Sequence, residues 1–218
     1  IGDYVNSIET VFHAADKFKE SGSKFHLAFS YLQIGITYLY IEQFQKSIAN
    51  YKLAKNEFLA FNDSLGAAIC ETNIGLVFLE QEKYDTAISL FHEASKEIIS
   101  SDRKITIGQI YHNLGISHAG IEQFDSSLFY LRRSLQIDKS INYDIGISAN
   151  YLELAKVMNA IEKKDSSLYF GQQALAIMER TPDIDIESEA SLVVANRLYE
   201  MGREKESAMY FDKYIELQ

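Results

Sequence analysis

The segment NIGLVFLEQEKYDTAISLFHEA, residues 73–94, has a counterpart forty residues earlier and another forty residues later. The earlier copy is QIGITYLYIEQFQKSIANYKLA from residue 33, and the later copy is NLGISHAGIEQFDSSLFYLRRS from residue 113. A fixed period of 20–50 residues is the signature of a repeat protein, in which each unit packs on its neighbours. The chain of 218 residues is therefore predicted to be one array of repeats.

Each repeat is predicted to contain two helices, A and B. Helix A carries an aliphatic residue followed by a small one, as in Ile34–Gly35, Ile74–Gly75, Leu114–Gly115 and Leu154–Ala155. Helix B carries small residues seven positions apart, which lie on one face of a helix. A glutamate recurs in the turn between the two helices, as Glu42, Glu82, Glu122 and Glu162. The small residues let the two helices approach closely.

Helix-breaking residues near positions 22, 62, 101, 141 and 181 divide the chain into units. Four full repeats are predicted at about 25–64, 65–104, 105–144 and 145–184. A degenerate fifth repeat, 185–218, is expected to be shifted by one residue, and residues 3–20 form a single B helix in front. The fold class is thus all-α, with about eleven antiparallel helices. The chain opens without Met and shows no polar capping helix, so it is expected to be a fragment of a longer protein.

These repeats resemble the tetratricopeptide repeat family. The resemblance rests on the aliphatic–Gly pair of helix A and on the aromatic, small, aromatic and Ala positions of helix B, and residues 73–94 are the closest copy. The period of forty departs from the thirty-four residues usual in the family. The resemblance implies a right-handed superhelix, with the A helices lining a concave groove that binds a protein or peptide.

Composition excludes several classes of protein. The formal net charge is −10 and no cluster of Lys and Arg is present, so direct binding of nucleic acid by this segment is not expected. No apolar run is long enough for a membrane span, so membrane insertion is not expected either. Cys70 is the only cysteine. The sequence leaves both a cytoplasmic and a periplasmic location open for a soluble module.

No constellation of residues points to catalysis, and no catalytic residue, metal or cofactor is expected. His112 and His118 are six residues apart, about 600° around a helix, so they point to different faces and cannot share a metal ion. His118 falls on an inter-helix core position. The DSSL segments at residues 125 and 165 are helix starts, where Asp and Ser serve as caps.

Candidate binding residues are those that helix A should direct into the groove. A carboxamide offers a donor and an acceptor together, so the row Gln33, Asn73, Asn113 and Glu153 is predicted to grip a peptide backbone. Apolar neighbours would supply side-chain pockets. Lys156 and Arg197 are predicted to hold a carboxylate. The complete predicted groove set is Gln33, Ile36, Tyr40, Asn73, Leu76, His112, Asn113, Ile116, Glu153, Lys156, Asn159 and Arg197.

The resemblance leaves three functions open. In the first, the array resembles the sensor region of a bacterial transcriptional regulator or histidine kinase, and it senses a peptide or protein. In the second, it resembles part of a Rap-type peptide receptor, some of which are response-regulator phosphatases whose activity resides in a helical bundle absent from this chain. The third is a passive scaffold or co-chaperone. Exposed apolar surface at uncapped ends also allows two chains to pair as a homodimer.

Overall fold

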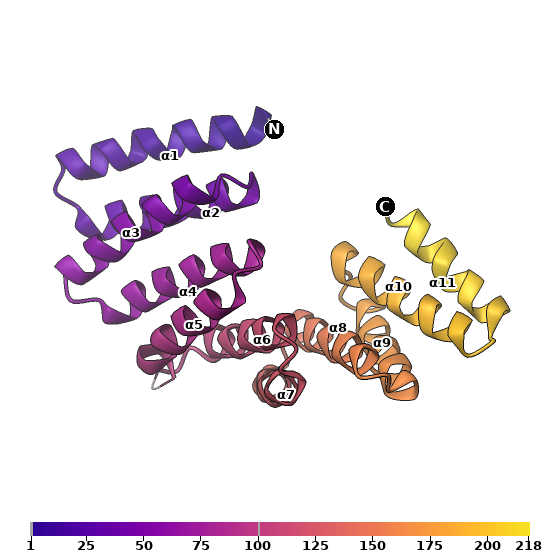
Figure 1. Ribbon diagram of the computed structural model, residues 1–218. Helices are drawn as coiled ribbons and strands as arrows, with labels where there is room; N and C mark the ends of the chain where they lie inside the picture. Colours follow the sequence, from indigo (N-terminus) through magenta and orange to yellow (C-terminus); the bar gives the residue numbers. More distant parts are fainter. Residues whose placement is uncertain (1, 100) are drawn as a thin grey trace. The chain divides into compact units, whose positions relative to one another are not determined.

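The computed structural model describes residues 2–99 and 101–218, with side chains from residue 11 onward, and these residues form eleven helices (Figure 1). Within them there is no β-strand, so the predicted all-helical fold with eleven helices is confirmed. The helices are α1 (Gly2–Glu20), α2 (Lys24–Tyr40), α3 (Phe44–Ala60), α4 (Ser64–Glu80), α5 (Tyr84–Ile98), α6 (Lys104–Gly120), α7 (Phe124–Ser140), α8 (Asp144–Ala160), α9 (Lys164–Met178), α10 (Ile184–Glu200) and α11 (Glu204–Glu216).

The helices keep the period of forty from α2 to the end of the described chain. The A helices are α2, α4, α6, α8 and α10, and each begins forty residues after the previous one. The B helices that follow them, α3, α5, α7, α9 and α11, do the same, and α1 is the B helix predicted at 3–20. The expected one-residue shift of the last repeat is wrong, because α10 and α11 begin forty residues after α8 and α9.

The chain divides into two compact units, unit 1 (Ile1–Arg103) and unit 2 (Lys104–Gln218), close to a predicted repeat boundary. Within unit 1, α2 contacts α4, and within unit 2, α6 contacts α8 and α8 contacts α10. Among the described residues, no B helix contacts another B helix in this way. The A helices therefore form the inner face of each unit and the B helices the outer face. That both units form one continuous array stays a prediction.

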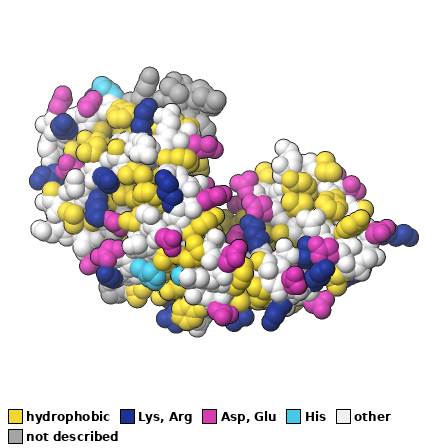
Figure 2. Space-filling model, viewed as in Figure 1, with side chains coloured by type: hydrophobic (Ala, Val, Ile, Leu, Met, Phe, Trp, Pro, Cys, Tyr) yellow, Lys and Arg dark blue, Asp and Glu magenta, His cyan; other side chains and the backbone are white. Residues whose placement is uncertain are grey.

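The surface mixes charges of both signs. On the face drawn in Figure 2, Lys and Arg side chains lie scattered among acidic and apolar ones. Across the described residues, no helix combines the length and the hydropathy needed to cross a membrane.

Contact between the two helices of a repeat depends on a glycine of helix A. A Cβ atom placed on Gly35 would lie 2.6 Å from the ring of Tyr51, and one on Gly75 would lie 2.7 Å from the ring of Phe91. One on Gly115 would lie 2.6 Å from Leu131. These three large partners on helix B are fully buried. In the fourth repeat the larger side chain of the pair lies on helix A. Ala155 occupies the position of the glycine, and Gly171 on helix B occupies the position of the large residue.

A hydrogen bond joins the same two helices. The Ser47 hydroxyl donates to the carbonyl of Gly35 over 2.8 Å, twelve residues earlier in the chain. Ser167 donates to Ala155 and Ser207 donates to Ala195, both over 2.8 Å. The bond is thus present in the first, fourth and fifth repeats, whereas the second has Ala87 and the buried Ser127 hydroxyl of the third has no hydrogen-bond partner. The last pair shows that the fifth repeat keeps the register.

Most helices end in a left-handed residue. After α2, the Glu42 amide donates to Leu39 O and the Gln43 amide donates to Tyr38 O, which is the Schellman pattern of a helix end. The left-handed position is held by Gly22, Glu42, Asn62, Glu82, Glu122, Asn142, Glu162 and Gly202, with φ between 53° and 74°. The recurring glutamates of the sequence are thus the residues at which the chain reverses from helix A to helix B.

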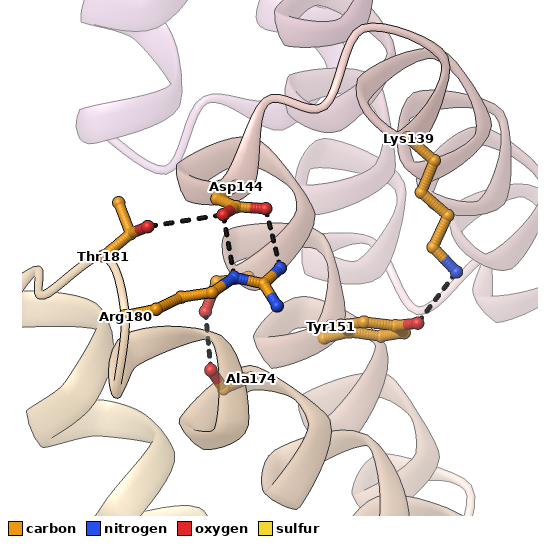
Figure 3. A network of polar contacts seen from close by, with 7 residues as sticks. Lys139, Asp144, Tyr151, Ala174, Arg180 and Thr181 are labelled. Atoms are coloured by element: carbon orange, nitrogen blue, oxygen red, sulfur yellow. Dashed lines mark hydrogen bonds and ion pairs between the residues drawn. The ribbon is translucent and has the colours of Figure 1, made fainter.

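The connection from α9 to α10 is held by side chains instead (Figure 3). Arg180 donates two hydrogen bonds of 2.9 Å to the carboxylate of Asp144, at the start of α8, and Thr181 adds one of 3.3 Å. Hydrogen bonding to Arg180 lowers the pKa of Asp144. Nearby, Lys139 donates to the Tyr151 hydroxyl over 2.8 Å. The contacts of Arg180 and Thr181 fix the α9–α10 connection to the start of α8, and the Lys139 contact joins α7 to α8.

Gly75→Ala should destabilise unit 1. The new methyl group would overlap the Phe91 ring, which is buried and cannot move away, and overpacking of this kind costs about 1–3 kcal/mol. Urea unfolding measures the loss, with Ala155→Gly as the control. The control removes a methyl group from the matching position and should cost at most about 1 kcal/mol. Full stability of Gly75→Ala would contradict the packing described for this glycine.

Glu82→Gly should stabilise the protein. Glu82 has a φ of 56°, where a side chain costs about 1–2 kcal/mol and glycine costs nothing. We expect a gain of about 1 kcal/mol in urea unfolding. Glu80→Gly is the matched control, since Glu80 is the last residue of α4 and helical glycine is unfavourable by about 1 kcal/mol. The two changes should act in opposite directions, and a loss of stability in Glu82→Gly would disprove the role of the turn.

Candidate peptide-binding face

The inner face of α2 is an exposed stripe. Phe25, Phe29, Gln33, Ile36 and Tyr40 follow one another at steps of three or four residues, so they share one side of the helix. Phe25, Phe29 and Tyr40 are 52%, 42% and 74% exposed, Gln33 is exposed and Ile36 is half-buried. Among the groove residues predicted on this helix, Gln33, Ile36 and Tyr40 therefore lie together. Phe25 was missed, although its spacing from Phe29 places it on the same side.

The neighbouring helix α4 continues this surface. Leu65, Ile69, Asn73 and Leu76 occupy the equivalent positions and are half-buried, and Glu80 at the end is exposed. Because α2 contacts α4, the two stripes form one surface, which we call the unit 1 face. It carries two carboxamides, from Gln33 and Asn73, among apolar side chains.

Aromatic packing supports one end of the unit 1 face. The Phe25 ring lies 4.8 Å from the Phe29 ring and 6.0 Å from Phe61, measured between ring centres. Phe29 packs edge-on against the buried Phe58 at 5.3 Å. The exposed rings are thus anchored to the core of unit 1, and such edge-to-face pairs add about 0.5–1.5 kcal/mol each.

In unit 2, the predicted cations of the groove are already paired. Lys156 lies 2.8 Å from Glu153 and 2.5 Å from Glu189 of α10. Burial lowers the pKa of Lys156, but the two glutamates outweigh this and raise it. Arg197 is buried and lies 2.5 Å from Glu200. Both cations are therefore paired with carboxylates of this chain, and their role in holding a ligand carboxylate stays a prediction.

Exposure falls along the predicted amide row. Gln33 is exposed, Asn73 is half-buried, and Asn113 is only 8% exposed in unit 2, where α8 packs against α6. Glu153 is half-buried and paired with Lys156. Only Gln33 and Asn73 therefore present open amides. The other predicted residues of unit 2 vary, since Ile116 and His112 are half-buried and Asn159 is exposed.

A buried polar network lies beneath the inner face of unit 2. The side-chain amide of Asn150 in α8 donates to the Asp138 carboxylate of α7 over 2.8 Å, to Ser134 over 2.9 Å and to Gly146 O over 2.8 Å. Its oxygen lies 3.0 Å from Nδ1 of His112 in α6. The network thus joins three helices, and His112 connects it to the inner face.

Two glycines make room for Asp138. A Cβ atom on Gly108 would lie 2.6 Å from one carboxylate oxygen, and one on Gly146 would lie 2.5 Å from the other. Asp138 is 3% exposed, and burial raises its pKa to about 6, although hydrogen bonds from Ser134 and Asn150 counteract this. No cation is among the groups that shift this pKa. Asp138 is therefore a buried carboxylate that is stabilised by hydrogen bonds alone.

This network could have been predicted from the sequence by comparing equivalent positions in the different repeats. Asp138 occupies the core position held by Phe58, Ile98 and Met178 in the other repeats. Asn150 likewise replaces Cys70, Ile110 and Ala190. Asp138 and Asn150 thus place a carboxylate and a carboxamide together in the core of one repeat junction, where most counterparts are apolar and the first repeat has the smaller Ser30 in the position of Asn150.

His118 is buried, as expected for a core position. Its Nδ1 lies 2.9 Å from the Gln123 side chain, and its ring stacks on Tyr130 at 5.2 Å. Across residues 11–99 and 101–218, no three His, Cys, Asp or Glu side chains lie close enough together to hold a metal ion.

A separate cavity of about 180 Å³ lies between α3, α4 and α5 of unit 1. Its walls include Leu59, Ala67 and Ala94, and an ion pair between Lys55 and Glu71 crosses its edge. Helices α3 and α5 are B helices, so this cavity is distinct from the unit 1 face.

The tetratricopeptide repeat family model matches residues 64–140, from the first residue of α4 to the last residue of α7. Residues 64–140 therefore carry tetratricopeptide repeats. The family resemblance seen in the sequence is confirmed. No curated protein matches the sequence.

Solved structures share the helical fold over nearly the whole chain. Aspartyl phosphate phosphatase F from Bacillus subtilis is 16% identical with a TM-score of 0.77, over 98% of this chain and 65% of that one. The Rap conjugation gene regulator of plasmid pLS20, solved with the Phr* peptide, is 18% identical with a TM-score of 0.77, over 91% and 55%. BtubC from P. vanneervenii is 14% identical with a TM-score of 0.78, over 99% and 88%. The chain therefore spans less than two thirds of the phosphatase and of the conjugation gene regulator, and the similarity concerns the fold.

Asp138→Asn should stabilise the protein at pH 8 and have little effect at pH 4. The pKa of Asp138 is raised from 3.8 to about 6, so the folded state favours the protonated carboxyl and loses this stability as the pH rises through 6. The shift corresponds to at most about 3 kcal/mol above pH 7. Urea unfolding of the variant and the wild type at pH 4, 6 and 8 measures the difference.

Asp165→Asn, at an exposed position in the first turn of α9, is the control. The stability of Asp165→Asn relative to the wild type should not increase between pH 4 and pH 8. A stability difference between Asp138→Asn and the wild type that stays constant over this range would contradict the burial cost of Asp138.

Proposed function

We propose that the chain is a protein- or peptide-binding module and that the unit 1 face is its principal binding surface. The observation that carries the proposal is the exposure of Phe25, Phe29 and Tyr40 on the same side of α2 as the open amide of Gln33. Contiguous exposed apolar surface with a few polar groups is characteristic of interaction sites. The carboxamides of Gln33 and Asn73 can each donate to and accept from a peptide backbone.

We further propose that the module serves as the sensor or interaction part of a bacterial signalling or transcriptional regulator. The similarity to a Rap gene regulator solved with a peptide supports this role. The net charge of −10 supports a protein or peptide as the partner and not a nucleic acid. Because Lys156 and Arg197 are paired with glutamates, a scaffold that clamps an acidic tail has less support.

The Rap-type alternative uses the same face. One similar structure is named a phosphatase, and this chain spans 65% of it. A binding role for this chain is compatible with both proposals, the regulator and the Rap-type receptor. Pairing of two chains is a further proposal, supported by the exposed Met209 and Ile215 of α11.

The double variant Gln33→Ala and Asn73→Ala should bind peptides at least tenfold more weakly than the wild type. Each amide contributes hydrogen bonds worth about 1 kcal/mol, and two such losses reduce affinity by more than tenfold. Retention of a random dodecapeptide library on immobilised protein identifies ligands, and titration of the retained peptides gives the affinities.

The matched control is Gln45→Ala with Asn56→Ala, which removes two exposed amides from the B helix α3. It should leave affinity unchanged. Equal affinity of both double variants and the wild type would remove the unit 1 face as the binding site.

A further inference from the structure

The hydrogen bonds of Asn150 determine the orientation of its amide. One end of the amide is surrounded by the Asp138 carboxylate, the Ser134 hydroxyl and the Gly146 carbonyl, at 2.8–2.9 Å. A carboxylate and a carbonyl only accept hydrogen bonds, so this end is the NH₂ group. The oxygen therefore faces His112.

The amide in turn determines the tautomer of His112. The Asn150 oxygen can only accept, so Nδ1 of His112 carries the proton and donates over 3.0 Å. In the neutral ring, Nε2 is then an acceptor. Nε2 has no hydrogen-bond partner among the described residues, and it is not one of their fully buried unpaired atoms. His112 thus presents an open acceptor at the inner face of unit 2.

The charge of the network and its surroundings favours a cationic donor. Asp138 is ionised above its pKa of about 6, and Asn150 relays its negative charge toward His112. On α10, Asp185 is an exposed carboxylate, whereas Glu189 is paired with Lys156 and Glu200 with Lys164 and Arg197. Lys156 is held by Glu153 and Glu189, so it supplies no free positive charge.

We propose that His112 binds an ammonium or guanidinium group of the peptide through Nε2, and that Asp138 acts through Asn150 as a positioning residue that holds the ring in this tautomer. The inference rests on the proposed peptide-binding function and adds that unit 2 recognises a cationic group. It also explains why one repeat junction carries a buried polar network at the cost of an apolar core. Features that lower stability in this way concentrate at functional sites.

The test uses three pools of dodecapeptides that are random except at one position, which is Lys, norleucine or Glu. Retention on immobilised protein is measured at pH 8. The wild type should retain the Lys pool at least fivefold more than the norleucine pool and should retain the Glu pool least. His112→Phe should lose the preference for Lys and keep its retention of the norleucine pool. His13→Phe, at an exposed position on α1, is the matched control and should behave as the wild type.

Equal retention of the Lys and norleucine pools by the wild type would overturn this inference and leave the proposed function intact. Retention of no pool would overturn both. Nitrogen NMR of the histidine ring provides a second measurement that needs no peptide. The wild type should show His112 protonated at Nδ1, and Asp138→Asn, which should remain folded, should increase the share of the Nε2-protonated form. A wild-type ring protonated at Nε2 would also overturn the inference.

Discussion

The close approach of helix A to helix B at a single glycine is the contact on which the architecture depends. At Gly35, Gly75 and Gly115 the missing Cβ atom is replaced by a buried side chain of helix B. The hydroxyl-to-carbonyl bond of Ser47 to Gly35 fixes the same pair of helices at the neighbouring position. Because a small residue, Gly or Ala, recurs at this position of helix A every forty residues, the two helices of each repeat can approach closely, and the inner face follows from their repetition.

Most of the fold could be predicted from the sequence, because small and apolar residues recur at a period of forty and mark the helix contacts. The turns were predicted as well, but not their conformation. Glu82 gave no sign that it adopts a left-handed φ, since glutamate has no preference for that region. The shift expected for the last repeat is absent, because Ser207 bonds to Ala195 in the same register as Ser167 to Ala155.

The candidate site was harder to predict than the fold. Helical spacing placed Gln33, Tyr40 and Asn73 on one side of their helices, and the structure agrees. Spacing alone could not show that Lys156 is paired with Glu189, which lies thirty-three residues later on another helix. Asp138 was overlooked because a carboxylate at a helical position ordinarily faces water. Only its neighbours, two glycines and an asparagine, make its burial possible.

The three-residue connections have a consequence for how such a chain changes length. Since every repeat reverses at the same left-handed position, a segment of forty residues can be removed or duplicated between equivalent points without altering any turn. The new junction would bring together helices that already possess matching glycine and serine positions. The connection from α9 to α10 departs from this equivalence, because Arg180 and Thr181 hold it to Asp144. The junction between α7 and α8 departs from it as well, because Asp138 requires Gly108, Gly146 and Asn150 together. Recombination between copies would separate this group, so it can be inherited only as a block.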